Sequence, residues 1–380
     1  MSQSELDLVL TEAARQGASD VHFVAGSPPL MRLHSMLTPA PGWAEPLQPP
    51  WLEEQLVGVM SQHQREEFLE TRELDMPYSL SGVGRFRVNV HRQRGSVAAA
   101  FRLVPTELPE LADLGIPAVA HDLALQPRGL VLVTGPTGSG KSTTLAAMVD
   151  IVNRERAVHI VTIEDPIEYL HSSKQALVTQ REVGSDTRSF TEALRRVLRQ
   201  DPDVILIGEL RDRETIEIAL TAAETGHLVL GTLHTQGAAS TVNRVIDVFP
   251  GEHQAQIRVQ LADTLQGVIS QTLLRRAGGQ GRVVATEVMV RTTAVANLIR
   301  EGDVAQLYSV MQTGSAYQMH TLDQDLRRLV GEGQLDRMEA ASVMVDSSAL
   351  LGVGSGHASA AYGDEWTESL AGDRAGSERW

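Results

Sequence analysis

A glycine-rich loop with a lysine and hydroxyl residues occupies residues 135–143. It reads Gly-Pro-Thr-Gly-Ser-Gly-Lys-Ser-Thr and lies between the apolar run 130–133 and a helical pattern, the setting that the G-x-x-x-x-G-K-[ST] motif requires. Its glycines let backbone N–H groups cradle phosphates, and the following helix N-terminus adds partial positive charge. Lys141 is placed for the phosphates and the Ser142 hydroxyl for Mg²⁺. The loop predicts a nucleoside triphosphate site with these binding residues: Gly135, Pro136, Thr137, Gly138, Ser139, Gly140, Lys141, Ser142 and Thr143.

A carboxylate at the end of a predicted strand is the first candidate for catalysis. Residues 158–163 are an apolar strand pattern that runs directly into Glu164. In open α/β sheets the carboxyl ends of strands lie where ligands bind. Hydrolysis needs a base that orients the attacking water, and Glu164 is the leading candidate. The alternative is an ordinary polar strand end.

Two more strands end in polar residues. The run 204–207 leads to Glu209 in a Walker B arrangement, in which an aspartate usually holds the Mg²⁺ shell. Glu209 is therefore a candidate metal ligand, or it acts through a metal-bound water or shares the base role with Glu164. His234 follows the strand 228–230 and is predicted to sense the γ-phosphate or to hydrogen-bond a catalytic carboxylate. A purely structural histidine is the alternative.

Arginines alternate with apolar residues in the segment 84–94, which places Arg85 and Arg87 on one face of a strand. One interpretation is a solvated basic face. The other is that some arginines act as fingers that reach the γ-phosphate in a neighbouring subunit, because the planar guanidinium suits transition-state oxygens. The sequence does not choose among Arg85, Arg87, Arg92 and Arg94.

Composition narrows the class of protein. The chain has 380 residues, enough for two domains, and a formal net charge of −15, which disfavours a general nucleic-acid binder. It contains no cysteine, so disulfides and cysteine-ligated zinc modules are excluded. No apolar run has the length of a membrane span, and the N-terminus is acidic rather than signal-like. We expect a cytoplasmic protein.

The elements that position these residues fall into two units. The first is predicted to be mixed α+β and to end near residue 105, with helices over 4–17 and 51–70 and strands over 20–24, 30–37 and 78–101. A proline-containing connector, 106–118, follows. The second unit alternates strands with helices, which predicts a mainly parallel sheet. The tail from Ser347 onward is rich in Gly, Ser and Ala and is expected to be disordered.

Four ordered motifs together resemble the ATPases of type II secretion and type IV pilus systems. They are 135–143, 163–168, 203–212 and 231–235, which match the family's Walker A, Asp box, Walker B and His box. Within that family the chain is similar to the PilT-like retraction ATPases of twitching motility. The segments that match this branch are 18–22, 85–89 and 297–301, and the resemblance covers roughly residues 1–345.

The resemblance implies an α/β protein with a PAS-like domain over 1–105, a linker over 106–118, a RecA-like ATPase domain over 119–346 and a disordered tail over 347–380. It implies a homo-hexameric ring that binds ATP and Mg²⁺ between domains and subunits, with Glu164 as base and Glu209 near the metal. It also implies a location at the cytoplasmic face of the inner membrane at the pilus base. There, ATP turnover would move the platform protein and return pilins to the membrane. The absent cysteines agree with this branch, since extension and type II secretion ATPases generally carry a tetracysteine zinc insertion.

The chain differs from the retraction branch at one position, so more than one function is possible. The branch's late motif commonly reads A-I-R-N-L-I-R-E, whereas here Ala296 stands at the position of the first arginine. The chain is then either a principal retraction motor or an accessory, paralogous ATPase that works with one. A P-loop nucleic-acid translocase is a third possibility, which the acidic charge disfavours, and no nucleic-acid partner is expected.

Overall fold

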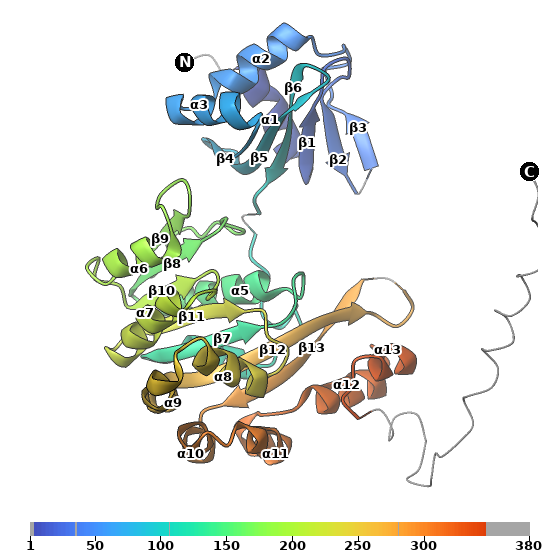
Figure 1. The fold of residues 1–380 in the computed structure, drawn as a ribbon. Helices are drawn as coiled ribbons and strands as arrows, with labels where there is room; N and C mark the ends of the chain where they lie inside the picture. Colours follow the sequence, from blue (N-terminus) through green and yellow to red (C-terminus); the bar gives the residue numbers. More distant parts are fainter. Residues whose placement is uncertain (1–3, 35, 106, 280, 347–380) are drawn as a thin grey trace, which may run out of the picture.

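The computed structural model describes residues 4–34, 36–105, 107–279 and 281–346. Two β-sheets, each with its own helices, are joined by the chain that follows β6 (Figure 1). The first sheet has six strands in the order β3-β2-β1-β6-β5-β4, and the second has seven in the order β13-β12-β7-β11-β10-β8-β9. The predicted disordered tail, residues 347–380, lies outside the described residues.

Helix α1 (Glu5–Arg15) confirms the predicted opening helix. The Ser4 side chain accepts a hydrogen bond from the Asp7 backbone N–H, and the Asp7 carboxylate accepts one from the Ser4 N–H, a capping box. Its apolar stripe is fully buried against the first sheet. After the helix Gly17 adopts a left-handed φ of 72°, which ends the helix at little conformational cost.

The first sheet is antiparallel throughout. Its strands are β1 (Asp20–Phe23), β2 (Leu30–Leu33), β3 (Met36–Pro39), β4 (Glu73–Leu80), β5 (Gly84–Gln93) and β6 (Ser96–Leu103). The prediction of one strand over 30–37 is wrong, because the chain turns at His34, where φ is +46°, and forms a hairpin. The prediction of one helix over 51–70 is also wrong. Ser61 caps a second helix, so that α2 (Pro49–Gly58) and α3 (Gln62–Thr71) are separate.

Phe101 is at the centre of this unit's core. It has no exposed surface, and the rings of Phe23, Tyr78 and Phe86 contact it edge-on at centroid distances of 5.3, 6.0 and 6.2 Å. Phe101→Ala is expected to lower the free energy of unfolding by about 3–5 kcal/mol, because it removes a large ring and leaves a cavity. Urea denaturation followed by circular dichroism measures the loss. Phe101→Leu, which fills most of the volume, is the control, and an equal loss for both would contradict the cavity explanation.

The second sheet confirms the predicted parallel arrangement. Strands β7 (Gly129–Thr134), β8 (His159–Glu164), β9 (Leu177–Glu182), β10 (Val204–Ile207), β11 (Leu228–Leu233) and β12 (Leu265–Arg275) are parallel, and β13 (Arg282–Val290) pairs antiparallel with β12. The central strands are buried on both faces, as parallel strands covered by helices require. All their carboxyl ends therefore meet at one edge of the sheet.

Helices cover both faces of this sheet. Two separate clusters of buried side chains lie on either side of it: α4 (Val119–Ala124) and α5 (Lys141–Glu155) contribute to one, and α6 (Phe190–Val197), α7 (Arg213–Glu224), α8 (Ala238–Asp247) and α9 (Gly251–Thr264) to the other. Helices α10 (Thr293–Glu301) and α11 (Leu307–Thr313) extend the second cluster. Helices α12 (Leu322–Gly331) and α13 (Arg337–Ala341) pack on β12 and β13. No helix within the described part of the chain is long and apolar enough to cross a membrane.

Part of the connector packs against the second unit, which its proline-containing composition did not indicate. Leu111 and Ile116 are buried in the cluster beneath α5. The Glu110 carboxylate accepts two hydrogen bonds from the Arg154 guanidinium, at 2.6 and 2.9 Å. The second half of the connector is thus fastened to the helix that follows the glycine-rich loop.

Candidate nucleotide site

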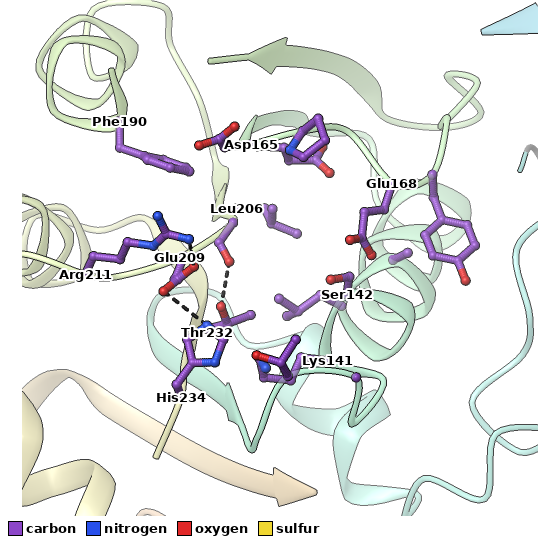
Figure 2. Close-up of a pocket in the computed structure, with 18 of the residues that line it drawn as sticks. Lys141, Ser142, Asp165, Glu168, Phe190, Leu206, Glu209, Arg211, Thr232 and His234 are labelled. Carbon is purple, nitrogen blue, oxygen red and sulfur yellow. Dashed lines mark hydrogen bonds and ion pairs between the residues drawn. The ribbon is translucent and has the colours of Figure 1, made fainter. Parts of the chain in front are cut away.

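The glycine-rich loop and the carboxyl ends of β8, β10 and β11 surround a single cavity of about 310 Å³ (Figure 2). The parallel sheet brings these strand ends together, although they are up to about a hundred residues apart in the sequence. The predicted residues that line it are Thr137, Gly138, Lys141, Ser142, Glu164, Glu209 and His234. Asp165, Glu168, Tyr169, His171, Phe190 and Arg211 also line it.

The loop needs its glycines for two reasons. Gly135, Gly138 and Gly140 have φ values of 139°, 77° and 89°, which L-residues with side chains seldom adopt. At Gly135 a Cβ atom would also collide with the backbone carbonyl oxygen of Gln271 on β12. The loop is therefore packed directly on β12, and helix α5 begins immediately after it at Lys141.

Lys141 is folded back onto the loop. Its Nζ donates hydrogen bonds to the backbone carbonyls of Gly135 (2.9 Å) and Pro136 (3.0 Å), and the residue is only 8 % exposed. Burial lowers its pKa, which the nearby carboxylates of Glu209 and Glu168 work to raise. An arriving phosphate offers this ammonium stronger, charged acceptors than the two carbonyls.

Glu164 lies at the last position of β8 and accepts two side-chain hydrogen bonds. The Thr162 hydroxyl donates to its Oε1 at 2.6 Å and the Gln180 amide donates to the same oxygen at 3.1 Å. Burial raises the pKa of this carboxyl, although both hydrogen bonds and the Glu168 backbone N–H favour the charged form. A carboxylate with a raised pKa beside a phosphate-binding loop has the properties of a general base.

Glu209 is held between two donors. Its Oε2 lies 2.7 Å from the Arg211 guanidinium and its Oε1 lies 3.1 Å from His234 Nε2, as Figure 2 shows. Burial works to raise the pKa of Glu209, but Arg211 and His234 outweigh it and bring the pKa below its usual range. Glu209 is therefore ionised, and the structure places His234 against it.

The residues around the cavity suit a magnesium ion that arrives with the nucleotide. The described residues contain no cluster of three or more His, Cys, Asp or Glu side chains that would hold a metal by themselves. Ser142 and four carboxyl side chains, Glu164, Asp165, Glu168 and Glu209, line the cavity. Mg²⁺ prefers one or two protein oxygens together with phosphate oxygens and water, and this donor set fits that preference.

Of the four candidate arginines, Arg85 and Arg87 lie near the start of β5, Arg92 lies near its end, and Arg94 lies in the turn that follows. Arg85 pairs with Glu182 at 3.2 Å and Arg87 lies 3.9 Å from Glu168, so both face the second unit of their own chain. Arg92 pairs with Glu53 at 3.1 Å and covers the Phe68 ring within the first unit. Arg94 is exposed in the β5–β6 turn, with a φ of 50°. The structure thus brings two of the four near the nucleotide cavity of the same chain.

Several residues around the glycine-rich loop were not predicted from the sequence. A second hollow of about 530 Å³ lies on the other side of the glycine-rich loop, and connector and β12–β13 residues line it: Asp113, Leu114, Ile116, Gln271, Leu273, Arg282 and Val284. Tyr169 hydrogen-bonds the Thr143 hydroxyl at 3.1 Å. Arg211 falls within the segment 203–212, which matches the Walker B motif, so its place at the site could have been predicted from the sequence. No sequence pattern marks Gln180.

Comparisons with known proteins agree with this site. The family model described as type II/IV secretion system protein matches residues 104–342. The chain is 51% identical to the type IV pilus retraction ATPase PilT of Pseudomonas aeruginosa over 87% of this chain and 96% of the relative. It is 41% identical to the type IV pilus ATPase PilU of the same organism, over 88% and 87% of the two chains.

A solved structure agrees as well. A crystal structure of the pilus retraction motor PilT with bound ADP superposes with a TM-score of 0.82 at 46% identity, and the match covers 90% of this chain and 98% of that one. The predicted fold class, a mixed N-terminal unit followed by a RecA-like ATPase unit, is confirmed, and so is the predicted resemblance. The chain belongs to the type II/IV secretion ATPase family and, within it, to the PilT-type pilus retraction ATPases.

Proposed function

We propose that this ATPase hydrolyses Mg-ATP as a homo-hexamer and that the hydrolysis drives type IV pilus retraction. The observation that carries the proposal is the convergence of Lys141, Glu164 and the Glu209–His234 pair on one cavity. These groups supply phosphate binding, a base and an ionised carboxylate at the position where a metal would arrive with the nucleotide.

The cavity and the neighbouring hollow bind different parts of the nucleotide. The β- and γ-phosphates take the place of the two carbonyls that hold the Lys141 ammonium, and the N–H groups of the loop surround them. The adenosine moiety occupies the second hollow, between the connector and β12–β13. Ser142 and Glu209 would hold Mg²⁺, which would neutralise charge on the phosphates.

Glu164 acts as the general base. It accepts a proton from the attacking water. Because its pKa is raised, it lies closer to the working pH than the pKa of an ordinary glutamate does. His234 and Arg211 hold Glu209 in one orientation and keep it charged.

Assembly extends the proposal beyond one chain. The residues that line the cavity all come from the second unit, and in the proposed ring an arginine from another copy of the chain adds positive charge beside the γ-phosphate. Arg85, Arg87, Arg92 and Arg94 are the candidates, and Arg94 is exposed at a hairpin turn. The ring works at the cytoplasmic face of the inner membrane on the pilus platform protein, and nucleic acid is not a partner.

Surface pili and twitching in a deletion strain test the proposed function. We expect excess pili and no twitching, restored by the wild-type chain and not by Glu164→Gln, because retraction needs turnover. Pilus counts by electron microscopy and the width of the twitching zone are the measurements. Bald cells would contradict retraction and indicate a role in assembly.

An accessory role is the second candidate. The alanine at position 296, where the retraction branch commonly has arginine, favours it. Ala296 lies in α10 with only 6 % of its surface exposed, within the buried cluster on that side of the sheet. Near-normal pili and motility in the deletion strain would support this role over that of a principal motor.

A further inference from the structure

Gln180 reaches the proposed catalytic base from a neighbouring strand. It lies on β9, the edge strand that pairs in parallel with β8. Its amide Nε2 donates to Glu164 Oε1 at 3.1 Å. The Thr162 hydroxyl donates to the same oxygen at 2.6 Å. Both side-chain donors act on Oε1, so neither of them occupies Oε2.

The backbone of one loop fixes the orientation of this amide. Gln180 Oε1 accepts a hydrogen bond from the His171 backbone N–H at 2.8 Å, and its Nε2 also donates to the Tyr169 carbonyl at 2.9 Å. An N–H can only donate and a carbonyl can only accept, so the amide cannot be flipped without losing both bonds. The same loop contacts the start of α5, because the Tyr169 and Thr143 hydroxyls are 3.1 Å apart.

We propose that Gln180 is a positioning residue for ATP hydrolysis, which holds Glu164 so that Oε2 accepts the proton of the attacking water. The inference rests on the proposed function, in which Glu164 is the base. Gln180 does not touch the nucleotide cavity itself: it acts through Glu164 and through the 169–171 loop.

The charges around Glu164 set the direction of the pH effect. Burial raises the pKa of Glu164; the Glu168 backbone N–H lowers it, while the Glu168 carboxylate raises it. The other charged or titratable groups nearby are Lys141 on the glycine-rich loop, Glu209 and His234 at the ends of β10 and β11, His171, and Glu182, which is opposite Glu164 on β9 and pairs with Arg85. Loss of the Gln180 donor removes a bond that favours the carboxylate, so the pKa of Glu164 rises further.

The test uses the full-length chain with Gln180→Leu, and with Gln180→Glu as a second variant that keeps the acceptor for the His171 N–H. We expect kcat to fall about ten- to a hundredfold, with KM for ATP little changed, since a hydrogen bond to a charged group is lost at the base and not at the phosphates. The acidic limb of the kcat profile should move up by about one pH unit. Thr162→Val should move it in the same direction, and Gln256→Leu, at an exposed position on α9, is the matched control.

The outcomes separate this inference from the proposed function. Gln180 variants with the wild-type kcat and acidic limb would overturn the inference, while an inactive Glu164→Gln would leave the proposed function in place. A rise in KM with an unmoved pH profile would assign Gln180 a purely structural role in the loop and would also overturn the inference. Full turnover by Glu164→Gln would assign the base to another residue and overturn the inference, while the retraction role would still be decided by the deletion strain.

Discussion

Replacement of Lys141 by alanine is expected to weaken nucleotide binding severely and to abolish ATP turnover. In the structure Lys141 is 8 % exposed and its ammonium has two neutral carbonyl partners, which we propose that the phosphates replace. Loss of one partner of a buried charge pair costs about 2–5 kcal/mol, equivalent to roughly a 30-fold or greater loss of affinity. Titration with a fluorescent ATP analogue measures the affinity directly.

The chain offers a matched control for this variant. It has only two lysines, Lys141 and Lys174. Lys174 Nζ lies 2.6 Å from the carboxylate of Asp150, a residue in the second half of α5, and Lys174 does not line the cavity. Lys174→Ala should therefore bind the analogue like the wild type. Equal affinities for Lys141→Ala and the wild type would refute the phosphate role of Lys141.

Glu164→Gln is expected to bind ATP and hold it without turnover. The amide oxygen of the new side chain can still accept the hydrogen bonds from Thr162 and Gln180, so the geometry is retained. Its NH₂ group cannot accept a proton, and loss of a general base lowers rates by about 10²–10⁴-fold. Quenched incubation with labelled ATP should recover ATP, and not ADP, from the purified variant.

The pH dependence of the wild type gives an independent check on the base. Only the ionised carboxylate accepts a proton, so the rate falls as the pH falls through the pKa of Glu164. Because burial raises that pKa, the acidic limb lies above the range of an ordinary glutamate. Glu217→Gln, at an exposed position of α7, should keep both the rate and the limb. A Glu164→Gln variant that turns over at the wild-type rate would assign the base to another residue.

The sequence alone determined the glycine-rich loop, the order of the two units and the edge of the sheet where the site lies. The reason is local: apolar strand runs end in polar residues, and parallel strands bring their carboxyl ends to one edge. Lys141, Ser142, Glu164, Glu209 and His234 could therefore be expected in one place before any coordinates, and they line one cavity.

Only the tertiary structure shows the contacts between residues that are far apart in the sequence. Strand β9 has no clear apolar alternation, because its edge position leaves most of its side chains partly exposed, so neither the strand nor Gln180 was predictable. The β12–β13 pair, which packs behind the glycine-rich loop, was missed as well. The alternation in 84–94 placed four arginines near one strand, but only folding separates Arg85 and Arg87, which face the ATPase unit, from Arg92 and Arg94. Which residues form ion pairs and hydrogen bonds depends on segments that are far apart in the sequence and meet only in the folded chain, so no local sequence pattern predicts these partners.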